Sequence, residues 1–409
     1  MTKTQPLQAT PPPLESSPSR DQPSPGPSMR RLVGIDLARA IAVFGMYVVH
    51  IGPPLSATDG VGSWIRYLAD GHSSVLFATL AGFSLVLIAG RREPKSGLAG
   101  RQARARIAIR AVVLLALGTV MARFYGEVVI IGFYGVYFLL ALPLVRLRAR
   151  TLAIIAAALA LVTPQLAFVL NSQLSGSIQQ NIIAHDPLLQ LSNVGVLDLL
   201  LTGFYPAITW ISFVVAGMAL GRLDLSATAV QWRLAIFGAA ITVAAYGTSL
   251  LLAGSGALRS MAEDGSSSSG GSGSVPLDSG SFDDKGSASG LLAAGPHSGT
   301  TFDIIGSVGV AILMIVAATV AMERLPRLRR LATPVIAVGT MSLTAYVGHF
   351  VIQGWLPYAG AGYDEESWTT LIMFVLGAIV FAGIWSRFFR RGPLEYLLNA
   401  ATKPAKLIR

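Results

Sequence analysis

The side chains best suited to acid–base chemistry in this sequence are its five histidines. Histidine titrates near neutrality and is the usual proton acceptor in acyl transfer. The absence of cysteine excludes a thiol nucleophile, thiolate metal sites and a disulfide framework. His50, His72, His297 and His349 are the candidate catalytic residues, and His185 is the fifth histidine. For each candidate, a packing or interfacial role near a helix end is the competing interpretation.

The segment before His50 carries two more polar residues at helical spacing. At about 100° per residue, Arg39 lies about 60° from Asp36 around the helix and His50 about 20° from Arg39, so the three share one stripe. Arg39 and His50 are about 16 Å apart along the axis. Asp36 and Arg39 are expected to face protein and to pair. The pair is either a lock that holds the helix or part of a site in which Arg39 binds phosphate.

Other polar residues add to the candidate binding site. Tyr134 lies on a polar helix face, and Tyr346 shares a face with His349. Such faces normally line a bundle interior or a wet cavity. Asp70 precedes a helix expected to begin near residue 72, and the favoured interpretation is that it caps this helix. No metal site is predicted, and the motifs G-x-x-x-x-G-K-[ST], H-E-x-x-H and G-x-S-x-G are absent from the sequence.

The composition is that of a polytopic membrane protein. The chain has 53% hydrophobic and 13% charged residues, with a mean hydropathy of +0.60, and soluble domains carry about twice that charged share. A net charge of +10 would suit a nucleic-acid partner. The basic residues, however, lie in short clusters between apolar runs, which favours membrane lipids over nucleic acid.

A span needs about 20 apolar residues. The sequence therefore predicts an all-α fold of about ten transmembrane helices, near 32–53, 72–90, 107–123, 128–146, 151–170, 197–220, 231–254, 303–322, 334–354 and 368–388. A cytoplasmic N-terminus places most of the 31 lysines and arginines inside, so both termini are predicted to be cytoplasmic. All five histidines then fall in the outer half of the protein.

Three regions follow from the composition. Residues 1–29 are rich in proline and are predicted to form a disordered cytoplasmic tail, 30–392 a transmembrane domain, and 393–409 a cytoplasmic C-terminal tail. Within the domain, residues 255–300 are expected to form a flexible extracytoplasmic loop, because residues 265–274 are all Ser or Gly.

Two short segments within the transmembrane domain have patterns of their own. The cluster at 296–303 is compact and polar, which is unexpected after a low-complexity stretch unless something anchors it. The G-x-x-x-G pattern at 217–221 predicts close contact between two helices.

The order of these segments resembles the transmembrane acyltransferases typified by lysosomal heparan-alpha-glucosaminide N-acetyltransferase and the related bacterial DUF418 (YeiB-like) proteins. The resemblance covers about residues 30–390. It rests on 31–50 (RLVGIDLARAIAVFGMYVVH), 132–138 (GFYGVYF) and 339–349 (GTMSLTAYVGH), and, for the actinobacterial branch, on 76–82 (LFATLAG) and 296–300 (PHSGT).

The resemblance implies a membrane-embedded enzyme of the bacterial plasma membrane. It would move an acyl group, most simply acetyl, from cytoplasmic acyl-CoA to a hydroxyl or amine of an extracytoplasmic envelope glycan, glycolipid or small metabolite. Acyl-CoA is then a co-substrate, and no bound cofactor is implied. The competing hypothesis is a multi-pass transporter or lipid flippase without covalent chemistry. A homodimer remains an open alternative.

The resemblance also orders the candidate residues. In the lysosomal enzyme the active histidine lies in the loop after the first helix, and residues 51–69 of this chain contain no histidine. His50 is therefore the first choice, as acyl-carrying nucleophile or as base, with the other three candidates as substitutes. The residues assigned to donor or substrate binding are Asp36, Arg39, Asp70, Tyr134 and Tyr346.

Overall fold

The structure is a computed structural model that describes residues 32–174, 176–254, 256–258, 288–356 and 366–408. The chain divides into Met1–Leu32 and a compact unit, Val33–Arg409, and the fold below is that of the second unit. The predicted tail at 1–29 and the Ser/Gly stretch at 265–274 lie outside the described residues.

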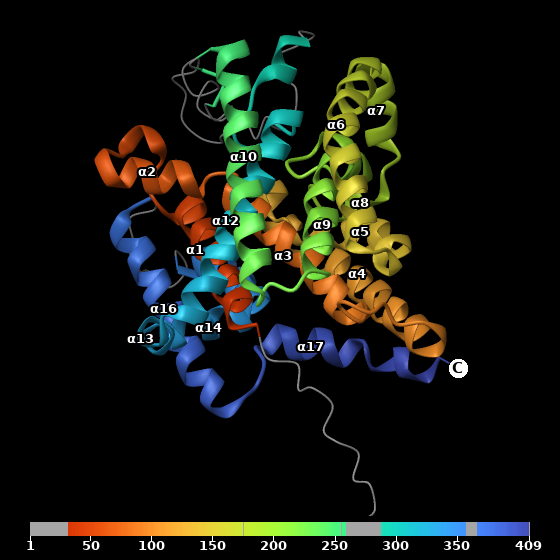
Figure 1. Ribbon diagram of the computed structural model, residues 1–409. Coiled ribbons are helices and arrows are strands. Elements are labelled where there is room, and N and C mark those ends of the chain that lie inside the picture. Colours follow the sequence, from red (N-terminus) through yellow and green to blue (C-terminus); the bar gives the residue numbers. More distant parts are fainter. Residues whose placement is uncertain (1–31, 175, 255, 259–287, 357–365, 409) are drawn as a thin grey trace, which may run out of the picture. The chain divides into compact units, whose positions relative to one another are not determined.

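All regular elements in the described ranges are helices, as predicted, with no strand among them (Figure 1). The α-helices are α1 (Val33–Ile51), α2 (Gly60–Ala69), α3 (His72–Ala89), α4 (Gly97–Tyr125), α5 (Ile131–Ala141), α6 (Ala149–Gln173), α7 (Gly176–Ala184), α8 (Pro187–Leu191), α9 (Ala207–Gly221), α10 (Thr228–Ala253), α12 (Thr301–Arg324), α13 (Pro326–Leu331), α14 (Thr333–Thr340), α15 (Ser342–Trp355), α16 (Trp368–Phe388) and α17 (Pro393–Ala401).

The described residues contain seven helical segments long and apolar enough to cross a membrane, or eight if α14 and α15 count as one bent span. The two remaining predicted spans correspond to shorter apolar helices, Ile131–Arg146 and Ala207–Gly221. The chain is therefore a multi-pass helical membrane protein. The cytoplasmic location of its termini stays a prediction.

Two predicted helices are not continuous, which corrects the sequence analysis. The prediction at 334–354 is wrong because α14 and α15 meet at an angle of 86°. At the break, Glu395 accepts hydrogen bonds from the backbone N–H groups of Leu343 (2.7 Å) and Thr344 (3.2 Å). These groups are unpaired donors at a helix start, so the carboxylate stabilises the new helix end.

The prediction at 197–220 is also wrong as a single helix. A short π-helical turn, Asp198–Thr202, ends before α9 begins at Ala207. Pro206, the residue before α9, has no backbone N–H with which to continue a helix from the preceding turn. The 15 residues of α9 span about 22 Å, less than the hydrocarbon thickness. Almost all of them are buried, so α9 is packed on every side by protein.

Helix α1 lies at the centre of the packing, since α3, α12 and α14 all contact it. Glycines allow the closest crossings. A Cβ added at Gly217 would overlap the carbonyl oxygen of Thr79 at the α3–α9 crossing, and one added at Gly339 would overlap that of Asp36 at the α1–α14 crossing. The close contact predicted from the G-x-x-x-G pattern is confirmed at Gly217.

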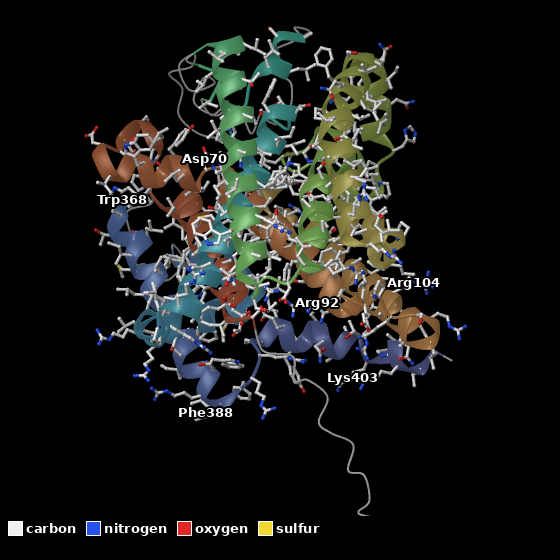
Figure 2. The ribbon with its side chains drawn as sticks, viewed as in Figure 1. Asp70, Arg92, Arg104, Trp368, Phe388 and Lys403 are labelled. Atoms are coloured by element: carbon white, nitrogen blue, oxygen red, sulfur yellow. The ribbon has the colours of Figure 1, made fainter. Side chains whose placement is uncertain are left out.

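The two ends of the unit differ in charge. Figure 2 shows Asp70 in the upper half of the view, whereas Arg92, Arg104 and Lys403 lie toward the opposite end. Near that end, α17 packs against α4 and α15 (Figure 1), so part of the predicted C-terminal tail is helical.

Candidate active site

His50 and His349 form a hydrogen-bonded pair. His50 lies in the last turn of α1 and His349 in α15, and the Nδ1 atom of His50 is 3.0 Å from Nε2 of His349. The Tyr47 hydroxyl donates to the carbonyl of Ala345 (2.7 Å), and the Gln353 amide donates to the carbonyl of His50 (3.4 Å). These bonds hold α15 against α1 and fix the register in which the two imidazoles meet.

His297 forms a second group with Asp70, in spite of 227 residues of separation along the chain. Its Nε2 atom lies 4.0 Å from Oδ1 of Asp70. The ring is stacked at 5.8 Å on Trp210 and lies 4.5 Å from the ring of Phe204. Burial lowers the pKa of His297 to about 4, although the nearby Asp70 carboxylate acts in the opposite direction. His297 is therefore neutral at pH 7 and can accept a proton.

The polar cluster at 296–303 is anchored, as the sequence required. Thr300 accepts a hydrogen bond from the backbone of Asp303 (3.1 Å) and caps α12, and Asp303 accepts one from the backbone of Gly299 (3.1 Å). His297 itself has a φ of 63°, which is uncommon for a residue with a Cβ. The surrounding bonds hold this backbone in place, and the imidazole is directed toward Asp70 as a result.

Asp70 does not cap α3, so that interpretation was wrong. The N-cap is Gly71, with a φ of 66° and no side-chain cap bond. A Cβ at Gly71 would lie 2.8 Å from Cβ of Pro296, so the turn packs tightly on the loop that carries His297. The carboxylate of Asp70 is thereby free to face His297 instead of the helix end.

The two histidine groups meet at one small cavity of about 60 Å³. His50, Asp70 and His297 all line it, together with Tyr205 and small residues of α3. A cavity of this size holds a few water molecules. The cavity therefore brings together one imidazole from α1 and one from the loop before α12.

Tyr346 joins this centre, whereas Tyr134 lies one ring further away. The ring of Tyr346 is 5.3 Å from that of His349, and its hydroxyl accepts a bond from the backbone N–H of Ile130 (3.2 Å). The ring of Phe77 stacks between the two tyrosines, 6.2 Å from Tyr346 and 5.6 Å from Tyr134. The Tyr134 hydroxyl is buried without a partner among the described residues.

Two candidate histidines do not line the cavity: His349, which reaches it only through His50, and His72. The Nδ1 atom of His72 lies 3.0 Å from the carbonyl of Asp70 and its Nε2 3.0 Å from the hydroxyl of Tyr246. That hydroxyl continues to Ser307 at 3.1 Å. Both ring nitrogens are therefore engaged in a network between α3, α10 and α12, which favours a structural role.

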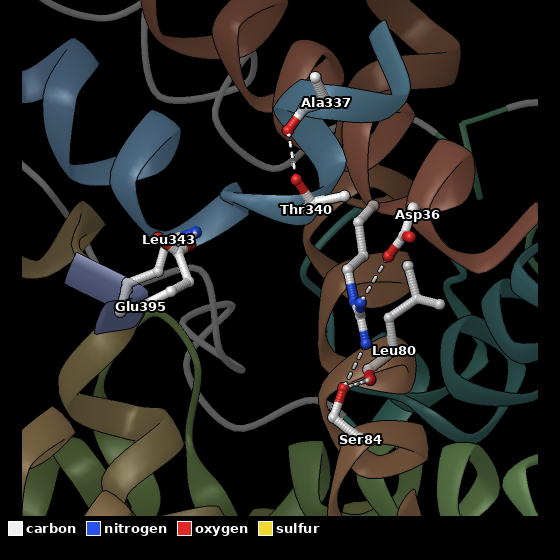
Figure 3. A network of polar contacts seen from close by, with 8 residues as sticks. Asp36, Leu80, Ser84, Ala337, Thr340, Leu343 and Glu395 are labelled. Atoms are coloured by element: carbon white, nitrogen blue, oxygen red, sulfur yellow. Dashed lines mark hydrogen bonds and ion pairs between the residues drawn. The ribbon is translucent and has the colours of Figure 1, made fainter. Parts of the chain in front are cut away.

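Asp36 and Arg39 pair as predicted. Nη1 of Arg39 donates to Asp36 at 3.0 Å, and Nη2 donates to Ser84 of α3 at 2.7 Å (Figure 3). Ser84 in turn donates to the carbonyl of Leu80. The pair lies in the first half of α1, away from His50 in its last turn. It therefore belongs to a different level of the bundle from the cavity.

Arg66 is a residue near the cavity that sequence reasoning did not single out. Its Nε and Nη1 atoms are buried and have no hydrogen-bond partner in the described part of the chain, and its charge acts on both His50 and His297. The only signal in the sequence was its place among the few cations assigned to the outer side. Within the described residues, no group of three or more His, Asp or Glu could hold a metal ion.

Comparison with known families gives two matches that together cover most of the unit. The model for the catalytic region of heparan-alpha-glucosaminide N-acetyltransferase matches residues 31–252. The model for DUF418, a family of proteins of unknown function, matches residues 290–404. No curated protein matches the chain significantly. The first match contains His50 and Asp70, and the second contains His297 and His349, so the cavity lies where the two matched regions meet.

Proposed function

Because the chain belongs to the heparan-alpha-glucosaminide N-acetyltransferase catalytic family, we propose that it transfers an acyl group across the membrane. The donor is a cytoplasmic acyl-CoA, acetyl-CoA in the simplest case. The acceptor is a hydroxyl or amine of an extracytoplasmic envelope glycan, glycolipid or small metabolite. The protein acts in a bacterial plasma membrane, surrounded by lipid, and a homodimer is compatible with this function.

The observation that carries the proposal is the cavity at which His50 and His297 meet. Acyl transfer needs a base for the acceptor proton, and a neutral imidazole within hydrogen-bond reach of the reacting group meets that need. His349 is hydrogen-bonded to the ring of His50. Asp70 lies 4.0 Å from the ring of His297, which Trp210 and Phe204 hold in place. Orientation of a base by a third group is the general logic of catalytic triads.

His50 is the residue we assign to the chemical step. If its Nδ1–H donates to Nε2 of His349, its own Nε2 keeps a lone pair for chemistry. Two reactions suit this nitrogen. It can attack the thioester carbonyl, which breaks the C–S bond, releases CoA thiolate and leaves an acyl-imidazolium; transfer of its Nδ1 proton to Nε2 of His349 gives the acyl-imidazole. Alternatively, it can remove the acceptor proton while the acceptor attacks the thioester directly.

The donor end is assigned to Asp36 and Arg39. A guanidinium matches phosphate geometry, and Arg39 lies about 16 Å along α1 from His50. This separation suits a long donor whose phosphate end and thioester lie far apart. Tyr346 lies beside the histidine pair and Tyr134 lies beyond Phe77, and we assign both to the walls of the path taken by the acyl group.

The direct test uses purified protein with acetyl-CoA labelled in the acetyl group and an envelope extract as acceptor source. His50→Gln is expected to reduce CoA release by about 10²-fold or more, the usual contribution of a general base. His185→Gln is the matched control, because that histidine is exposed in the turn that follows α7. Label retained on the wild-type protein would identify the acyl-imidazole route.

The competing transporter hypothesis makes the opposite prediction in the same assay. Substrate would accumulate across the membrane, no thioester would be consumed, and CoA release would be equal in wild type and His50→Gln. That result would overturn the enzymatic proposal.

A further inference from the structure

Arg66 is half-buried, and two of its guanidinium nitrogens are buried without a hydrogen-bond partner in the described residues. It lies on α2, whose other face exposes the apolar side chains of Val61, Trp64 and Leu68. A short amphipathic helix of this kind suits the membrane interface, with the apolar face toward lipid. On its protein side, Nε and Nη1 of Arg66 are inaccessible and make no hydrogen bond within the described residues.

The guanidinium lies near the candidate active site, one helical turn before Asp70, although it does not line the cavity. Its positive charge acts on His50 and on His297, the two histidines that line the cavity. Asp70, one helical turn further along, has its carboxylate 4.0 Å from His297. No ion pair joins Asp70 to Arg66 within 4.0 Å in the ranges that the structure describes.

A buried charge without a counter-charge is unfavourable, and removal of such a charge normally stabilises a folded protein. A cation kept at this position is explained if a ligand supplies the opposite charge. The planar fork of a guanidinium matches a carboxylate or phosphate with two parallel hydrogen bonds. The two unpaired atoms, Nε and Nη1, can each donate a hydrogen bond, and each can form one arm of such a pair together with Nη2.

We propose that Arg66 binds an anionic group of the acceptor substrate, a carboxylate or a phosphate, and so selects acidic acceptors. This assignment rests on the proposed acyltransferase function. It places the acceptor's anion beside α2 and its hydroxyl or amine in the cavity between His50 and His297. The donor's phosphates are assigned elsewhere, because Arg66 lies one turn from Asp70, at the end away from Arg92 and Arg104 (Figure 2).

The first test is the stability of the ligand-free protein. Arg66→Gln removes an unpaired buried charge, so the melting temperature is expected to stay the same or to rise. Arg123→Gln, at an exposed position on α4, is the matched control. A lower melting temperature for Arg66→Gln alone would mean that Arg66 stabilises the fold through a partner within the protein, which would overturn the proposal.

The second test measures ligand binding without turnover, by the shift in melting temperature that glucuronate, glucose 1-phosphate, neutral glucose and CoA each produce. Wild type is expected to respond to an acidic sugar and not to glucose. The larger of the shifts produced by glucuronate and by glucose 1-phosphate shows whether the site prefers a carboxylate or a phosphate. The affinity for the acidic sugar, obtained from this shift, should fall about tenfold or more in Arg66→Gln. It should fall less in Arg66→Lys, which keeps the charge.

Two results would contradict the assignment. One is the absence of a shift with either acidic sugar. The other is a response to CoA that Arg66→Gln abolishes, which would move Arg66 to the donor site. His50→Gln separates this proposal from the enzymatic one, because it should still bind the acidic sugar even though turnover is lost. If His50→Gln proves fully active, the assignment of the chemical step to His50 fails while the binding result stands.

Discussion

The hydrogen bond between His50 and His349 limits what either imidazole can do. One of the two facing nitrogens must carry the proton, so the pair offers one free basic nitrogen toward the cavity when His50 is the donor. Replacement of His349 would leave His50 in place without its orienting partner. The pair is therefore a single functional unit at the residue scale.

The first residue-scale prediction concerns Arg39. Arg39→Ala is expected to raise KM for acetyl-CoA about tenfold while kcat changes little, because a charge-assisted bond to phosphate would be lost at a distance from the chemistry. Initial rates of CoA release measure both constants. Arg104→Ala, an exposed cation on α4, is the control. An unchanged KM together with a lower melting temperature would contradict donor binding by Arg39. It would show instead that the Asp36–Arg39 ion pair only holds α1 against α3.

The second prediction concerns pH. Burial lowers the pKa of His297 to about 4, against about 6.5 in an unfolded chain. Between these values the unfolded state binds more protons, so stability falls as the pH falls through this window and is unaffected above it. At pH 5 the loss is about 2 kcal/mol.

The measurement for this prediction is the melting temperature from pH 7 to pH 5. Wild type should lose more stability than His297→Gln, which has no group to titrate at this position. His185→Gln, with its exposed side chain, is the control and should follow wild type. Parallel curves for wild type and His297→Gln would show that His297 is not held neutral by burial.

Residue type and spacing alone predicted part of this site. His50, His297 and His349 were candidates because of their chemistry, and the Asp36–Arg39 pair because unpaired charges are costly within a membrane. The role of Asp70 was misread because a carboxylate before a helix normally caps it, whereas here Gly71 adopts the left-handed conformation at the cap. Arg66 was missed because only burial distinguishes it from an ordinary surface cation.

At the scale of elements, close helix crossings place these residues. Gly217→Ala is expected to destabilise the protein by about 1–3 kcal/mol, because the new methyl group would overlap the backbone of α3 at Thr79. Thermal unfolding in detergent measures the change. Gly247→Ala on α10 is the matched control, since a Cβ there meets nothing within 4 Å. Equal melting temperatures for the two variants would mean that α3 and α9 are further apart than described.

The helix breaks could not be read from hydropathy. Residues 334–354 have the length and apolarity of one span, yet α14 and α15 meet at 86°. The break depends on Glu395, which lies far along the chain and satisfies the first backbone donors of α15. Pro206 was a local signal for the end of the preceding turn. Length and composition therefore predicted which segments are helical, while distant contacts decided where they bend.

At the scale of the whole unit, the site depends on both matched regions. The part that matches the N-acetyltransferase catalytic model supplies His50 and Asp70, and the part that matches DUF418 supplies His297 and His349. No local pattern joins these four residues. Their convergence follows from the contacts of α1 with α12 and α15, which only the folded chain shows.

The distribution of charge over the whole unit indicates the direction of the proposed acyl transfer. Cations gather at the end away from Asp70 (Figure 2), and the positive-inside rule assigns such an end to the cytoplasm. The donor should therefore be accepted from that side alone. On this predicted orientation, the cavity and Arg66 face the other side.

The most direct measurement uses inverted membrane vesicles, whose cytoplasmic face is outside, loaded with envelope extract. Acetyl-labelled acetyl-CoA is added outside, and label on enclosed, membrane-impermeant acceptor is counted. Transfer that depends on His50 and persists in His185→Gln is the predicted result. Equal labelling of the enclosed acceptor by His50→Gln and wild type would contradict acyl transfer through the histidine cavity, as would its complete absence in wild type.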